Sequence, residues 1–178
     1  GADRTVRIWN TQTGKNVRTL VGHASEVWSI AFSPQGDRLV SGSQDYTARV
    51  WSAANGAELQ RFRQHQEPVF TAAFSPDGAY IASGGYDKRI MVWRADRDEP
   101  VYATLIDDVT ERLDSDLPPE AVAVDPDVTV LTGHSGGIRD VHFSSDGRFI
   151  VSASRDNTLR VWPWTEPSTE GRQLRGHG

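Results

Sequence analysis

Serine, histidine and aspartate, the residue types of a hydrolytic triad, occur together three times in this sequence at one fixed spacing. Counted from Asp45, His23 lies 22 residues earlier, Ser41 lies 4 earlier and Trp51 lies 6 later. The same offsets recur in two further sets: His65, Ser83, Asp87 and Trp93, and His134, Ser152, Asp156 and Trp162. A hydrolase needs one site with an exposed nucleophile and an oxyanion hole. Because the trio is repeated and always accompanied by tryptophan, we interpret it as structural and expect no catalytic residue.

The histidines do not predict a metal site. Four of the five occupy equivalent places in successive repeats, so they should lie apart, and His142 stands alone. A structural zinc site needs four ligands gathered around one point, and the sequence contains no cysteine. Neither a GxxxxGK[ST] loop nor a GxGxxG fingerprint is present, and we interpret the glycine pairs at 84–85 and 136–137 as turn residues. We therefore expect no metal and no cofactor.

Composition excludes several classes of function. The 178 residues are 37% hydrophobic and 24% charged, as in a globular protein, and no apolar run approaches the length of a membrane-spanning helix. The formal net charge of −5 disfavours nucleic-acid binding, which needs a basic surface. No targeting peptide is evident, and the lack of cysteine is compatible with a reducing compartment. We expect no membrane partner and an intracellular, cytoplasmic location, with a nuclear one as the alternative.

The elements that must position the repeated residues are short β-strands. In residues 27–32, 38–43 and 47–51, β-branched, aromatic and small residues form short runs separated by turn residues. The turns are SPQG at 33–36 and the polar stretch around Asp45, whose side chain can accept hydrogen bonds from nearby backbone N–H groups. A fourth strand at 57–62 leads toward the next histidine. The same series recurs along the chain, so the sequence predicts an all-β protein without a required helix.

The repeat has a fixed length with one insertion. Trp9 to Trp51 and Trp51 to Trp93 each span 42 residues, whereas Trp93 to Trp162 spans 69, so 27 residues are inserted. The predicted organisation is one segment, 1–178, divided into a partial unit and three full ones: 1–20, 21–64, 65–131 with an acidic insertion at about 95–127, and 132–178.

These features resemble the WD-repeat β-propeller family: a period of 42, four strands per unit, a GH dipeptide and a strand that ends in Trp. The resemblance implies that each His, Ser, Asp and Trp set forms a hydrogen-bonded tetrad within one blade. The aspartate that follows Trp in the family is replaced by Asn10, Ser52, Arg94 and Pro163, and Gln64 stands where Gly should precede His65.

The resemblance also sets the expected size. Three complete four-stranded blades and a partial first blade amount to about half of a seven-bladed propeller. An open propeller exposes strand edges and an apolar blade face, both of which favour association. We therefore expect further propeller blades from the same or another chain, rather than a self-sufficient four-bladed ring.

Positions where the copies differ are the candidates for function. Trp28 and Phe70 align with Arg139, Ser29 and Thr71 with Asp140, and Ala31 and Ala73 with His142. Exposed aromatic and arginine side chains are frequent anchors of protein interfaces. The predicted partner-binding residues are Trp28, Gln44, Tyr46, Phe70, Tyr86, Lys88, Arg139, Asp140 and Arg155.

Two functions follow from this interpretation. The first is a non-catalytic scaffold that binds other proteins or peptides through rim loops. The alternative is a sensor or autoinhibitory module of a larger multidomain signalling ATPase, kinase or other enzyme. Residues 94–127 contain eleven acidic residues and three arginines. Two hypotheses stand for this stretch: a solvated loop, with a short helix allowed at 107–117, or a docking loop for a basic partner.

Overall fold

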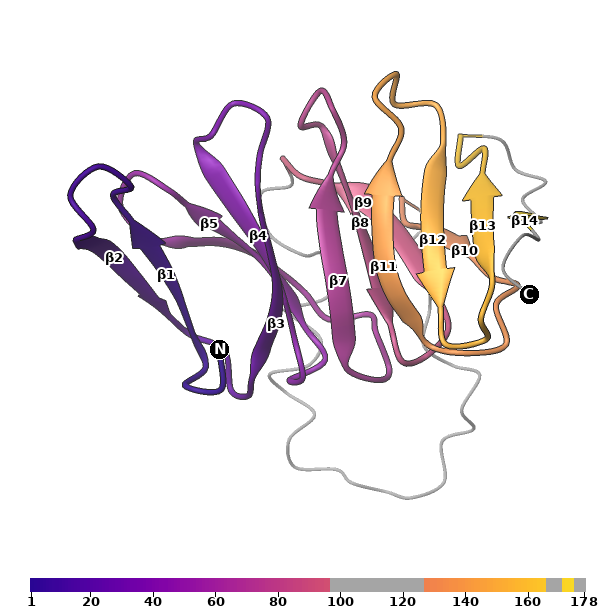
Figure 1. Ribbon diagram of the computed structural model, residues 1–178, viewed down its shortest axis with the longest axis horizontal. Helices are drawn as coiled ribbons and strands as arrows, with labels where there is room; N and C mark the ends of the chain where they lie inside the picture. Colours follow the sequence, from indigo (N-terminus) through magenta and orange to yellow (C-terminus); the bar gives the residue numbers. More distant parts are fainter. Residues whose placement is uncertain (97–126, 166–170, 175–178) are drawn as a thin grey trace.

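The computed structural model describes residues 1–96, 127–165 and 171–174, and these residues form strands and turns without a helix. Strands β1 (Thr5–Trp9) and β2 (Asn16–Val21) form a two-stranded antiparallel sheet. Three four-stranded antiparallel sheets follow, standing side by side in chain order (Figure 1). The all-β prediction is confirmed.

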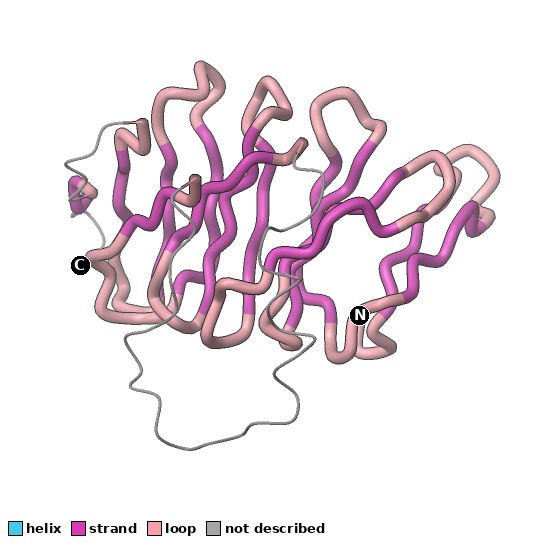
Figure 2. Tube along the Cα trace, turned by 180° about the vertical axis from the view of Figure 1, so that it is seen from behind, coloured by secondary structure: helices cyan, strands magenta, loops and turns pink. Residues whose placement is uncertain are grey.

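Each four-stranded sheet is a meander in which consecutive strands are neighbours. The first contains β3 (Val27–Phe32), β4 (Arg38–Ser43), β5 (Ala48–Ser52) and β6 (Glu58–Phe62). The second contains β7 (Val69–Phe74), β8 (Tyr80–Gly85), β9 (Ile90–Arg94) and β10 (Thr129–Leu131). The third contains β11 (Ile138–Phe143), β12 (Ile150–Ser154), β13 (Leu159–Trp162) and β14 (Arg172–Leu174). These are the predicted blades, seen from the opposite side in Figure 2.

The turn that carries each repeated aspartate has one conformation throughout. The residue after the aspartate is left-handed at Arg4, Tyr46, Lys88 and Asn157, with φ between 63° and 67°. In each case the aspartate accepts a hydrogen bond from the backbone N–H two residues further on, as from Thr47 to Asp45 at 3.0 Å. This bond offsets part of the cost of a left-handed conformation in residues other than glycine. The turn therefore depends on the aspartate rather than on glycine.

The core lies between neighbouring sheets. The first strands β3, β7 and β11 pack against one another in order, and β7 and β11 also contact the second strand of the preceding sheet. We number the three four-stranded sheets as the first, second and third blades. One apolar cluster joins Val40 and Val50 of the first blade to Ala72 and Phe74 of the second. A second joins Ala82 and Val92 of the second blade to residues of the third, including Ile138 and Val141. Each blade is thus stabilised largely by its neighbours, as in repeat architectures generally.

Close packing explains the glycine pair at 84–85, and the interpretation of it as a turn was wrong: Gly84 faces the next blade, whereas Gly85 faces His65 and Asp87 of its own blade. Both residues lie at the end of β8. A Cβ on Gly84 would lie 2.5 Å from Cγ2 of Ile138, the first residue of β11. The equivalent residue in the first blade, Gly42, faces Val69 in the same way. Glycine is therefore required where the next blade begins.

One apolar face has no counterpart packed against it within the described residues. Ile30 and Phe32 are 54% and 55% exposed, although the residues at the same repeat positions in β7, Ala72 and Phe74, are 3% and 9% exposed. The latter two pack against β4 and β5 of the preceding blade. The sheet of β1 and β2, which precedes β3, contains the equivalents of β5 and β6 only, so within the described residues no equivalent of β4 covers β3. The face of β3 is therefore an interface between blades that is left open.

Candidate functional site

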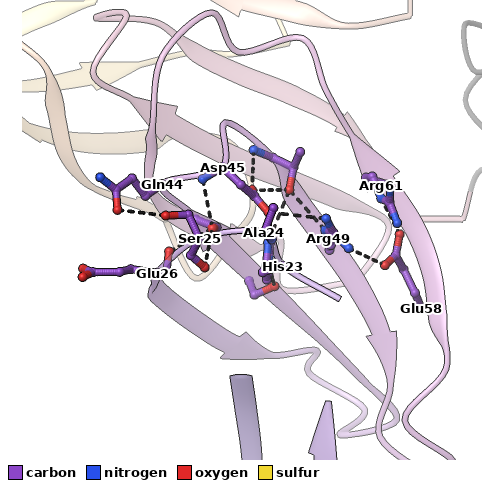
Figure 3. Close-up of polar contacts among 12 residues, drawn as sticks. His23, Ala24, Ser25, Glu26, Gln44, Asp45, Arg49, Glu58 and Arg61 are labelled. Carbon is purple, nitrogen blue, oxygen red and sulfur yellow. Dashed lines mark hydrogen bonds and ion pairs between the residues drawn. The ribbon is translucent and has the colours of Figure 1, made fainter. Parts of the chain in front are cut away.

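The first repeated set forms a continuous hydrogen-bonded chain between two strands, a loop and a turn, and Figure 3 shows the part in which His23 contacts Asp45. His23 Nδ1 lies 2.8 Å from Asp45 Oδ2, and His23 Nε2 lies 2.7 Å from Ser41 Oγ. Trp51 Nε1 donates to the same Ser41 Oγ at 2.8 Å. An ionised carboxylate can only accept, so Nδ1 carries the proton and Nε2 accepts from the serine hydroxyl. The chain ties the loop before β3 to the turn after β4.

The second and third sets have the same connectivity but differ in detail. In the third, the three distances are 2.7, 2.8 and 2.8 Å. In the second, the bond from Trp93 to Ser83 lengthens to 3.4 Å. Gln64, which stands in place of the expected glycine, has a buried Oε1 without a hydrogen-bond partner. The departure seen in the sequence thus coincides with the loosest of the three sets.

Additional donors surround the aspartates of the first and third sets. Thr47 Oγ1 donates to Asp45 at 2.6 Å, and Thr158 Oγ1 donates to Asp156 at the same distance. The second set has Arg89 at this position, which offers only its backbone N–H. Arg49 also contacts Asp45, at 3.3 Å, and forms a shorter ion pair with Glu58 at 2.7 Å. The first set is therefore the most heavily hydrogen-bonded.

These contacts shift the acidity of the carboxyl groups. Burial opposes ionisation of Asp45, but the hydrogen bonds from His23, Thr47 and the Ala24 amide outweigh it and hold the pKa well below its ordinary value. Burial acts in the same direction on Asp87, and the hydrogen bond from His65 leads the contributions that lower its pKa. Both carboxylates are therefore stabilised as anions by the folded state.

Acid should unfold the protein through these aspartates. Their folded pKa values lie below the ordinary 3.8, so the stability they contribute is complete above that pH and is lost progressively as the pH falls below it. Urea titrations at pH 5, 4, 3 and 2.5 should give a falling midpoint. The variant Asp45→Asn, which cannot titrate, should be less stable at pH 5 but lose less on acidification. An equal acid slope in the variant would contradict this account.

A second cluster lies at the ends of the first strands, where three equivalent positions stack in a row. The indole of Trp28 in β3 stacks on the ring of Phe70 in β7, with centroids 4.8 Å apart and planes 16° from parallel. The guanidinium of Arg139 in β11 lies 5.0 Å from the same ring centroid. Because β7 lies between β3 and β11, Phe70 lies between the other two. In Figure 1, this is the lower end of the sheets, where β7 and β11 begin.

The turns of two blades complete this cluster. Arg155, from the turn after β12, lies over the rings of both Phe70 and Tyr86, at 5.3 and 4.8 Å. The loop before β7 adds Glu67 and Pro68. Together these residues line an open pocket of about 650 Å³, which we call the aromatic–arginine pocket: Trp28, Glu67, Pro68, Phe70, Tyr86, Arg139 and Arg155.

The pocket gathers five of the nine residues proposed from the sequence as partner-binding and leaves four outside its lining. Gln44 accepts a hydrogen bond from Ser25, and Asp140 contacts Thr71 and His142. Tyr46 and Lys88 occupy the left-handed turn position. Comparison of the copies at strands and turns missed Glu67 and Pro68. The same comparison in the loop would have found them, because the equivalent pairs are Ser25–Glu26 and Gly136–Gly137.

Across 1–96, 127–165 and 171–174, no three histidine, aspartate or glutamate side chains are grouped to hold a metal ion. The same ranges contain no helix that is long and apolar enough to cross a membrane. The acidic stretch singled out in the sequence falls mainly on 97–126, outside the described residues, as does the predicted helix at 107–117.

Comparison with known families agrees with the repeat geometry. The model of the "WD domain, G-beta repeat" family matches residues 14–52, 56–94 and 126–163, which is more than half of the chain. The chain belongs to the WD-repeat family. Each matched WD repeat runs from the last strand of one sheet into the third strand of the next, so it contains one complete tetrad.

Individual relatives match over about one WD repeat. Human WD repeat and SOCS box-containing protein 1 is 48% identical over 48 residues, which is 26% of this chain and 11% of the relative. Cross-pathway control WD-repeat protein 2 of Flammulina velutipes is 46% identical over 43 residues, 24% of this chain and 14% of that protein. An F-box protein of Saccharomyces cerevisiae is 44% identical over 43 residues, 24% of this chain and 6% of that protein. Each match thus spans a small part of the relative's length.

Proposed function

We propose that the chain is a non-catalytic interaction scaffold that binds another protein or a peptide through the aromatic–arginine pocket. The observation that carries the proposal is the convergence of Trp28, Phe70, Tyr86 and two arginines from three blades on one open pocket. Tryptophan, tyrosine and arginine are the residue types most enriched among the energetically dominant residues of interfaces. Trp28 and Tyr86 remain 39% and 46% exposed despite their stacking, so they keep surface for a partner to cover.

The tetrads support the non-catalytic part of the proposal. Ser41, Ser83 and Ser152 are at most 1% exposed, and each hydroxyl is bonded to both a histidine and a tryptophan. A serine nucleophile must instead be exposed to its substrate beside an oxyanion hole. The same Ser, His and Asp contacts occur in each of the three four-stranded blades, as expected if their role is structural.

Further propeller strands are the second class of partner that we propose. The exposed face of Ile30 and Phe32 matches faces that are buried between blades elsewhere in this chain. Two strands equivalent to β3 and β4 would complete the sheet of β1 and β2. The equivalent of β4 would pair with β1, whose only partner among the described strands is β2, and would cover this face together with β1. The relatives support a role within assemblies, since one is named for WD repeats together with a SOCS box and another for an F-box.

A displayed peptide library tests the pocket directly. Panning the chain against random peptides should enrich sequences that bind the parent and lose at least tenfold in affinity for Phe70→Ser, because Phe70 supports the whole stack. The control is Phe32→Ser, an exposed phenylalanine on β3 that does not line the pocket. If the enriched peptides bind both variants like the parent, or if none is enriched, the pocket is not the binding surface.

A further inference from the structure

We infer that the aromatic–arginine pocket selects an acidic side chain of the bound peptide, a carboxylate or a phosphate, held between Arg139 and Arg155. This inference rests on the proposed function and specifies the chemistry of its ligand. It depends on the state of the two guanidinium groups: where their faces lie, what pairs with their N–H groups, and what other charges surround them.

Both guanidinium groups lie over aromatic rings. Arg139 lies over Phe70, and Arg155 lies over both Phe70 and Tyr86. A guanidinium that stacks on a ring by its face keeps its five N–H donors in the plane of the group, directed away from the ring. Stacking also fixes the orientation of the donors in advance, which reduces the entropy lost on binding. Both arginines are therefore positioned to bind an oxyanion by their edges.

Neither guanidinium forms an ion pair with a described residue, in contrast to two other arginines that lie over aromatic rings. Arg148 also lies over a ring, that of Phe149, but it pairs with Asp146 at 2.7 Å. Arg94 lies over Tyr80 and pairs with Asp96 at 2.8 Å. Arg148 and Arg94 are thus each neutralised by a neighbouring aspartate, unlike the two arginines that line the pocket. The missing counterion is the group that a ligand would supply.

The balance of charge in the pocket favours an anion over a cation. Its lining contains two guanidinium groups and one carboxylate, that of Glu67. Aromatic clusters can also hold cations against their ring faces. Here, the faces of Phe70 and Tyr86 already carry arginine, so a ligand cation would meet two like charges. An arginine or lysine of a partner is therefore disfavoured at this position.

The arginines are specific to one blade, whereas the rest of the turn geometry is shared. Arg139 replaces the aromatic residue found at the equivalent positions of β3 and β7. Arg155 precedes Asp156 in the turn where Gln44 and Tyr86 precede their aspartates. The third blade therefore supplies both positive charges, while Trp28 and Pro68 supply an apolar wall on the other side. A peptide with an acidic residue beside an apolar one matches this arrangement.

Arrayed peptides with a fixed central residue test the inference. The probes are eleven-residue peptides, randomised except at the centre, which is Glu, Gln, phosphoserine, Ser or Lys. The folded chain should bind the Glu and phosphoserine sets at least tenfold more strongly than the Gln, Ser and Lys sets. The double variant Arg139→Gln with Arg155→Gln should lose this preference. Arg148→Gln is the matched control, because Arg148 is stacked and exposed but lies outside the pocket and should retain it.

The outcomes separate the two proposals. Peptide binding that Phe70→Ser abolishes, without any preference for Glu or phosphoserine, would leave the scaffold function standing and overturn the acidic ligand. A preference that survives in the double arginine variant would also overturn it. If the chain prefers only the Glu set or only the phosphoserine set, the inference is supported, and the result identifies the anion as a carboxylate or as a phosphate. Binding that no pocket variant alters would overturn the proposed function itself.

Discussion

Replacing Asp45 with alanine should destabilise the protein by about 3 kcal/mol, the upper end of the range for leaving buried hydrogen-bonding groups without partners. Asp45 accepts hydrogen bonds from His23, the Ala24 amide and both the hydroxyl and the amide of Thr47, and it contacts Arg49. Its side chain is only 6% exposed, so water cannot readily replace these contacts. Equilibrium unfolding in urea, followed by tryptophan fluorescence, measures the change.

The same substitution in the next blade provides the comparison. Asp87 accepts from His65, the Gln66 amide and the Arg89 amide, and it has no threonine hydroxyl. Asp87→Ala should therefore cost less than Asp45→Ala, about 1–2 kcal/mol on the same scale. Equal losses would mean that the extra donors around Asp45 contribute nothing. A melting temperature unchanged in Asp87→Ala would show that the tetrad of that blade is not structural.

The tetrads were predictable from the sequence because their geometry is local to one blade. Each set joins residues whose separations, such as 22 from His23 to Asp45, are the same in every copy. The antiparallel meander that brings them together also follows from period-two patterns and turn residues. Repetition was the decisive observation, because it changed the interpretation of Ser41 from a candidate nucleophile to a structural hydroxyl.

The aromatic–arginine pocket was only partly predictable, since it depends on how neighbouring blades are placed. Alignment of the repeats placed Trp28, Phe70 and Arg139 at the same repeat position and showed that the residue type there differs between copies. It could not show that equivalent side chains in adjacent blades stack on one another, because the angle between sheets is set by packing in the shared core. The role of Gly84 was missed for the same reason. Its neighbour, Ile138, is distant in sequence and belongs to the next blade.

The close contact between Gly84 and Ile138 leads to the second prediction of a large loss of stability. Gly84→Ala should destabilise the protein by about 1–3 kcal/mol, the usual cost of overpacking a core. The new Cβ would lie 2.5 Å from Cγ2 and 2.9 Å from Cβ of Ile138, which is fully buried. Gly42→Ala should cost less, because the nearest atom there is Cγ1 of Val69 at 3.1 Å. Thermal unfolding of both variants gives the comparison.

A double-mutant cycle shows whether this cost arises between the blades. Ile138→Ala alone should cost about 2–5 kcal/mol through the cavity it leaves. Combined with Gly84→Ala, it should cost less than the two single losses together, because Cγ2 is gone and the new methyl group occupies part of the cavity. Ile138→Val retains a Cγ2 atom, so it should give no such relief. Strict additivity in both cycles would mean that Gly84 is required for strand β8 itself, and that the blades are not held at the spacing this contact sets.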